Sequence, residues 1–327
     1  MSVLSPAPET ESAPGLGMTA LLLGAIALGL LAGLSAPPIG AAASFAIDPT
    51  LLVLVGLLFF DLRLGAVTAA FGNLRFIALA WGANFLVVPV VGFALASLFL
   101  SGQPLVFTGL LIYFLAPCTD WFLAFTRLAK GDTALGAALL PINLVTQLLL
   151  FPVWLWIFTS HAGFVDFAAI PGVLLQWFLL PFGIAQAARW LASRGLDAST
   201  TGRLHSAVGA AIPLVTAALV FQLFSANATV VAAHVDAVPP AAAAIFLFFA
   251  AMFLVGEAAT RVFGLSHGEQ ALLAMTTAAR NAPMMLVITA VAIPGQPLVY
   301  AALVIGMLLE LPHLLGLKHL LLAKLDR

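Results

Sequence analysis

The stretch "LIYFLAPCTDWFLAF", residues 111–125, is an apolar run whose middle is polar, at residues 117–120. An α-helix needs about 20 residues to cross the hydrocarbon core of a bilayer, and this stretch lies inside an apolar run of that length, residues 104–129. Proline has no N–H and keeps the residue before it out of α geometry. The stretch therefore predicts a membrane-spanning helix that breaks near its middle.

The whole chain has the composition of an all-α polytopic membrane protein. It is 63% hydrophobic and 8% charged over 327 residues, whereas a soluble domain of that length would expose far more charge. A net charge of −1 excludes a nucleic-acid partner, which needs a basic face, and a single cysteine excludes an internal disulfide. The lipid bilayer is the partner that this composition requires.

Ten apolar runs of spanning length follow one another. They cover residues 17–36, 49–64, 74–100, 104–129, 133–160, 167–192, 203–224, 239–264, 269–293 and 297–323. Residues 1–16 are polar and lack the basic region of a cleavable signal peptide, so we expect a disordered tail.

The basic residues fall in alternate loops and helix ends. On one side lie Arg63, Arg75, Arg127, Lys130, Arg189, Arg194, Arg203, Arg261, Lys318, Lys324 and Arg327. The opposite loops, near 37–48, 101–103, 160–166, 225–238 and 294–297, contain no Lys or Arg. The positive-inside rule then predicts a multi-pass protein of the cell membrane with both termini cytoplasmic.

The ninth run, "LLAMTTAARNAPMMLVITAV" at residues 272–291, carries a second polar cluster with a proline, at residues 280–283. A shift of 163 residues superposes Cys118 on Asn281. Five spans separate the two clusters, and an odd number of spans per repeat inverts the second repeat. We therefore expect inverted repeats whose discontinuous helices 4 and 9 meet near mid-membrane, as in many secondary transporters. The predicted units are the tail 1–16 and the repeats 17–160 and 161–327.

Further polar residues recur at helical spacing near the two breaks. Asn143 and Gln147 are four residues apart on span five, and Glu310 and His313 are three apart on span ten. Asn84 lies five residues before a proline on span three. We expect these faces to line a central cavity.

Four motifs together resemble the arsenite-efflux permease branch of the bile acid/sodium symporter superfamily. They are "WGANFLVVPVVGFAL" (81–95), "APCTDWFLAFTRLAKGDTALGAALLPIN" (116–143), "TTAARNAPMML" (276–286) and "GMLLELPHLL" (306–315). The resemblance implies ten helices in a panel domain (spans 1, 2, 6 and 7) and a core domain (spans 3–5 and 8–10), with helices 4 and 9 crossed. It also implies that Cys118 and Glu310 take part in transport and that Asn84 matches the asparagine of helix three.

The resemblance bears on the coupling ion as well. Sodium-coupled members hold their ions with acidic and amide side chains at the helix crossing, where this sequence has Arg280 and Asn281. A guanidinium then stands where sodium would bind, and we expect Arg280 to pair with Asp120 and a proton, rather than sodium, to be the coupling ion. A carboxyl group that burial shifts towards neutral pKa is suited to carry that proton, and Glu310 and Asp120 are the candidates.

Each candidate residue also has a structural interpretation. Cys118 is either a soft ligand for trivalent arsenic or a small packing residue. Asp120 and Arg280 are either a substrate site or a structural ion pair, and Glu310 is either the proton carrier or a packing carboxylate near Pro312. His313 lacks a second Glu-x-x-His pair and is interpreted as a cavity or surface histidine.

The sequence thus predicts a secondary active transporter without cofactor or metal. The favoured function is efflux of arsenite or a related oxyanion, and the alternative is sodium- or proton-coupled symport of a small organic anion. The predicted substrate-binding residues are Asn84, Cys118, Thr119, Asp120, Asn143, Gln147, Arg280 and Asn281.

An intramembrane enzyme would need a nucleophile with a base beside it, and an ATP-driven pump would need a Walker-type loop. The sequence contains neither. A receptor remains open because a fold does not fix a function. We expect a monomer or homodimer; Gly29 and Gly33 form a G-x-x-x-G that suits either internal packing or a dimer face.

Overall fold

The computed structural model describes residues 14–61, 72–118, 121–159, 172 and 175–325, and in these ranges the regular structure is helical apart from one isolated β-bridge. The α-helices are α1 (Pro14–Ser35), α2 (Pro37–Asp61), α4 (Leu74–Gly82), α5 (Val88–Leu100), α6 (Pro104–Leu115), α7 (Trp121–Leu128), α8 (Thr133–Thr159), α10 (Leu180–Gly195), α11 (Ala198–Ala226), α12 (Ala228–Ala233), α13 (Val238–Phe263), α14 (His267–Ala278), α15 (Ala282–Ala292) and α16 (Pro297–Leu325). The π-helices η1 (Ala83–Val87) and η2 (Leu175–Leu179) and the 3-10 turn η3 (Val235–Ala237) complete the described elements.

Seven of the described helical segments are long and apolar enough to cross a membrane, which confirms a polytopic membrane protein. They are Gly17–Ser35, Pro38–Asp61, Leu74–Leu100, Thr133–Phe158, Ser199–Ala226, Val235–Phe263 and Pro297–Leu325. The shorter apolar helices α6 and α15 belong to the two spans whose middles were predicted to break.

Two of the predicted outer loops are wrong because they are largely helical. Helix α2 starts at Pro37, so residues 37–48 extend the second span and do not form a loop. A proline is tolerated in the first turn, where the missing N–H would have no helical partner, and Pro49 lies within α2. The loop expected at 225–238 likewise contains α12 and η3.

The third span is widened at η1, between α4 and α5. The Val88 N–H donates to Ala83 O, five residues back, one residue before Pro89. A proline clashes with the carbonyl four residues before it, and one π-turn relieves such a clash within a continuous helix. Asn84 lies inside this turn and is completely buried. The same pattern recurs at η2, which ends two residues before Pro181.

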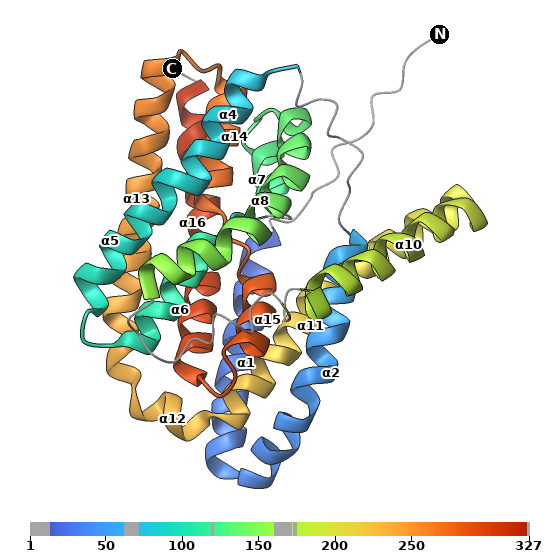
Figure 1. Ribbon diagram of the computed structural model, residues 1–327, viewed down its shortest axis with the longest axis vertical. Coiled ribbons are helices and arrows are strands. Elements are labelled where there is room, and N and C mark those ends of the chain that lie inside the picture. The colour runs from blue at the N-terminus through green and yellow to red at the C-terminus, as the bar shows by residue number, and fades with distance from the viewer. Residues whose placement is uncertain (1–13, 62–71, 119–120, 160–171, 173–174, 326–327) are drawn as a thin grey trace.

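The helices form two packed groups (Figure 1). Helices α1, α2 and α11 pack on one another, and α10 runs along α2 and projects from the rest of the molecule. In the second group, α6 packs on α5 and α16, α13 on α5, α14 and α16, and α15 on α16. The groups touch through α16 with α1 and α11 and through α15 with α2. Both helix breaks therefore belong to the second group.

Gly29 and Gly33 of α1 face α11 within the chain. A Cβ at Gly29 would lie 2.7 Å from Phe221 O, and one at Gly33 would overlap Ser225 O. The G-x-x-x-G therefore serves internal helix packing, which settles one of the alternatives that the sequence left open.

Candidate functional site

The two helix breaks pair with each other through their backbones. Cys118 N–H donates to Ala279 O at 3.1 Å, and Asn281 N–H donates to Ala116 O at 2.9 Å. These two bonds form a short antiparallel bridge between the end of α6 and the link from α14 to α15. Backbone groups that leave a helix inside a membrane must find partners in the protein. The two breaks supply partners for each other and so hold their surrounding side chains in one place.

Arg280 lies at this bridge and is completely buried. Its Nη1 donates to Phe114 O at 3.1 Å, and its Nη2 donates to Thr276 O at 2.7 Å and to Asn84 Oδ1 at 3.2 Å. The guanidinium also lies 5.8 Å from the ring centroid of Phe248. The cation therefore ties α6, η1 and α14 together through neutral oxygen atoms.

The Thr276 hydroxyl, four residues before this arginine, accepts hydrogen bonds from two side-chain amides. Asn84 Nδ2 donates to Thr276 Oγ1 at 3.0 Å, and Asn143 Nδ2 donates to the same oxygen at 3.4 Å. Asn84 thus accepts from Arg280 and donates to Thr276, so its orientation is fixed from both ends. The elements η1, α8 and α14 converge here.

Gln147 faces a pair of thioethers on α15. Its Nε2 donates to Met285 Sδ at 3.3 Å and, more weakly, to Met284 Sδ at 3.9 Å. Asn281 Nδ2 lies 3.6 Å from the same Met284 sulfur. The residues around the breaks therefore combine amides, sulfur atoms and one cation in a completely buried setting.

Glu310 enters this region from α16. It is 2% exposed, and its Oε2 accepts a hydrogen bond from the Tyr113 hydroxyl at 2.9 Å. Glu310 also interacts electrostatically with Arg280. The Glu310 carboxyl group therefore lies against α6, which ends at one break, and interacts with Arg280, which lies at the other break.

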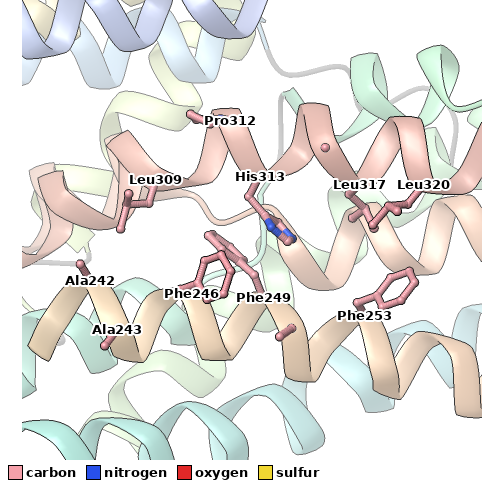
Figure 2. A pocket seen from close by; sticks show the side chains of 12 residues that line it. Ala242, Ala243, Phe246, Phe249, Phe253, Leu309, Pro312, His313, Leu317 and Leu320 are labelled. Atoms are coloured by element: carbon pink, nitrogen blue, oxygen red, sulfur yellow. The ribbon is translucent and has the colours of Figure 1, made fainter.

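His313 does not share this surrounding, although it lies one turn from Glu310. Its ring stacks on Phe249 of α13, with centroids 4.1 Å apart and an interplanar angle of 6°. Figure 2 shows the imidazole between α13 and α16, in an apolar groove of about 950 Å³. The expectation that Glu310 and His313 line one cavity is therefore wrong, because their side chains turn to different neighbouring helices.

The comparison with known proteins decides the family. A family model described as the Sodium Bile acid symporter family matches residues 48–234, more than half of the chain. The chain belongs to the Sodium Bile acid symporter family. It is also similar to the Arsenical-resistance protein Acr3 of Corynebacterium glutamicum, with 29% identity over 256 residues, 73% of this chain and 68% of that protein. The protein is accordingly a transporter and not an enzyme.

In this symporter-family protein the structure brings most of the predicted site residues together. Asn84, Asn143 and Arg280 are linked through the bonds above, while Gln147 and Asn281, the residue after Arg280, both contact Met284. The Cys118 side chain is completely buried beside the bridge. Thr119 and Asp120 lie outside the described residues, and with them the expected pair of Asp120 with Arg280.

Four residues at the site were not predicted from the sequence: one threonine, one tyrosine and two methionines. Thr276 is four residues before Arg280, so helical spacing alone would have placed both on one face. Tyr113 is one of two tyrosines in the chain, and a hydroxyl inside a spanning run normally requires a partner. Met284 and Met285 gave no such signal, because methionine is common in apolar cores.

Proposed function

We propose that this protein exports arsenite or a related oxyanion in exchange for protons. The observation that carries the proposal is the pairing of the two helix breaks, which places a buried cysteine, Cys118, against the segment that holds Arg280 and Asn281. A thiolate is a ligand that trivalent arsenic accepts, and one thiolate alone permits release of the cargo. The similarity to an arsenical-resistance protein supports the same substrate.

The proton is carried by Glu310 in this proposal. Its carboxyl group is buried, hydrogen-bonded to Tyr113, and acts on Arg280. Protonation removes the negative charge that balances the cation, so proton and cargo occupancy can be linked through Arg280. The guanidinium occupies the position where the resemblance places sodium, which supports a proton as the coupling ion.

The architecture proposed for this cycle is ten spans in two inverted repeats, with both termini in the cytoplasm. The group formed by α4 to α8 and α13 to α16 would be the core, and α1, α2, α10 and α11 the panel. The contacts between the groups, α16 with α1 and α11 and α15 with α2, are fewer than those within each group, which supports movement of the core along the panel.

Flux into proteoliposomes tests the proposal. Arsenite flux that follows an imposed pH gradient, is unchanged by sodium, and is lost in both Cys118→Ser and Glu310→Gln is expected. Arsenite flux that requires sodium would contradict the coupling. Full flux in Cys118→Ser would remove the thiol from the mechanism, and absence of arsenite flux under every gradient would exclude the function.

A second candidate, symport of a small organic anion, has one observation in its favour. Arg280 is a completely buried cation at the site, and a guanidinium is a natural partner for a carboxylate. Flux of a labelled carboxylate in the same vesicles, without arsenite flux, would select this alternative.

A further inference from the structure

Two buried amide oxygens on α8 lack a hydrogen-bond donor among the described residues. They are Asn143 Oδ1 and Gln147 Oε1, and both side chains are at most 1% exposed. The two residues are four apart and so lie on one face of α8. A buried acceptor without a donor is destabilising, and each such atom in a native protein requires a reason.

The orientation of the Gln147 amide is fixed by the two thioethers. A methionine sulfur carries no hydrogen, so only the NH₂ end of the amide can face it. The contacts of Nε2 with Met285 Sδ at 3.3 Å and Met284 Sδ at 3.9 Å therefore leave Oε1 as the end that awaits a donor. The Asn143 amide is oriented in the same way. Its Nδ2 donates to Thr276 Oγ1, which leaves Oδ1 as the end without a donor.

The hydrogen bonds of the site's cation go to oxygen atoms other than these two acceptors. Both terminal nitrogens of Arg280 donate to Phe114, Asn84 and Thr276, and its Nε has no hydrogen-bond partner among the described residues. An anionic cargo such as a carboxylate brings acceptors only, and the free groups of α8 are acceptors as well. A cargo that carries O–H groups matches them, because each hydroxyl can donate one hydrogen bond.

We propose that the cargo binds as a neutral trihydroxide whose O–H groups donate to Asn143 Oδ1 and Gln147 Oε1. Met284 and Met285 are positioning residues that hold the Gln147 amide in the accepting orientation. This inference rests on the proposed function and names the form of its substrate. Arsenite is the neutral trihydroxide at neutral pH, and antimonite and boric acid share that class.

The test compares four single variants in proteoliposomes at neutral pH. Asn143→Leu and Gln147→Leu each remove one acceptor and should raise the KM for arsenite about tenfold. Met285→Leu keeps the volume but removes the sulfur that orients the amide, so KM should rise about threefold with kcat unchanged. Val145→Leu, on α8 and 57% exposed, is the matched control and should behave as the wild type. Each Leu variant removes an unpaired acceptor together with the hydrogen bond that the same amide donates, so its melting temperature should differ little from that of the wild type.

The outcomes separate this inference from the proposed function. If the wild type moves arsenite and the first three variants keep KM within about twofold, the inference is overturned and the proposed function stands. If the wild type moves no arsenite, the purified protein is titrated with boric acid and with acetate while its melting is followed. Stabilisation by boric acid that is lost in Gln147→Leu supports the inference, whereas stabilisation by acetate alone, or by neither, overturns it.

Discussion

Arg280 shows at the scale of one residue how a buried charge can hold a membrane protein together. Its fork reaches three oxygen atoms on three elements, at 2.7–3.2 Å. Lysine keeps the charge but offers a single nitrogen, which cannot meet the same acceptors. We expect Arg280→Lys to lower the unfolding free energy by about 3 kcal/mol and to abolish transport, measured by tryptophan fluorescence during denaturation in detergent and by flux.

The matched control for this prediction is Arg203, an exposed arginine at the start of α11 that donates to the Thr200 hydroxyl at 3.3 Å. A surface contact of this kind contributes little, so Arg203→Lys should leave stability and flux unchanged. Equal stability of both variants would show that the fork of Arg280 does not brace the two breaks.

The residues of the site were predictable from sequence where helical spacing and charge in an apolar run gave a signal. Asn84, Asn143 and Arg280 were found in this way, and the structure joins them through Thr276. The thioethers were not found because their role depends on which amide they face, a contact between α8 and α15 that no spacing along one helix encodes. The prediction for His313 was wrong for the opposite reason. Helical spacing grouped it with Glu310, but its ring stacks on Phe249 of α13.

At the scale of the element, the packing of α1 on α11 gives a prediction with an internal control. A Cβ at Gly29 would come within 2.7 Å of Phe221 O, whereas a Cβ at Gly24 of the same helix meets nothing within 4 Å. We expect Gly29→Ala to lower the unfolding free energy by about 1–3 kcal/mol through overpacking. Gly24→Ala should raise it by about 0.5–1 kcal/mol, because alanine favours a helix. Thermal melting of both variants in one detergent checks the contrast, and the reverse order would show that α1 does not pack so closely.

Helix α11 begins with a cap that is sensitive to acid. Asp197 Oδ2 accepts from the Ser199 hydroxyl and from the backbone N–H groups of Ser199 and Thr200, at 3.1 and 3.2 Å. The side-chain bond from Ser199, followed by that from Thr200, lowers the pKa of Asp197 from 3.8 to about 2. Because the pKa of Asp197 is lower in the folded state, its carboxylate stabilises the fold at pH values above the unfolded-state pKa. This stabilisation is lost as the pH falls through the folded-state pKa.

The acid sensitivity is measured against Asp197→Asn, which keeps an accepting oxygen but does not titrate. We expect the melting temperature of the wild type to exceed that of the variant above pH 3.8 and the gap to close as the pH falls to about 2. A gap that stays constant over this interval would show that the cap does not depend on the carboxylate.

The positions of the helices were largely predictable from the length of the apolar runs, but the helix ends were not. Ten runs located the described spanning helices, but the start of α2 at Pro37 and the helices α12 and η3 were missed. The second span was predicted to begin at residue 49, beside a proline, whereas α2 continues through Pro49. Pro141 and Pro213 lie inside α8 and α11, within the runs predicted for them. In a membrane, neighbouring helices and π-turns satisfy the groups that a proline frees, so proline marks a break only where a partner backbone is present.

At the scale of the whole molecule, the direction of the helices can be tested with the single native cysteine removed. Helix α11 runs from Ala198 to Ala226 and α13 returns from Val238 to Phe263, so η3 lies at the end opposite to the link between α10 and α11 (Figure 1). The basic residues gather at the latter end, which predicts that it is cytoplasmic.

In a Cys118→Ser background, Asp236→Cys on η3 and Ser193→Cys near the end of α10 place one thiol at each end, both at exposed positions. A membrane-impermeant maleimide added to intact cells should label position 236 at once and position 193 only after permeabilisation. The reverse pattern would invert the protein in the membrane, and Glu310 and the paired breaks would then meet the proton gradient from the other side. This labelling therefore decides which end of the molecule takes up cargo from the cytoplasm, while the proton and cargo gradients set the direction of the proposed exchange.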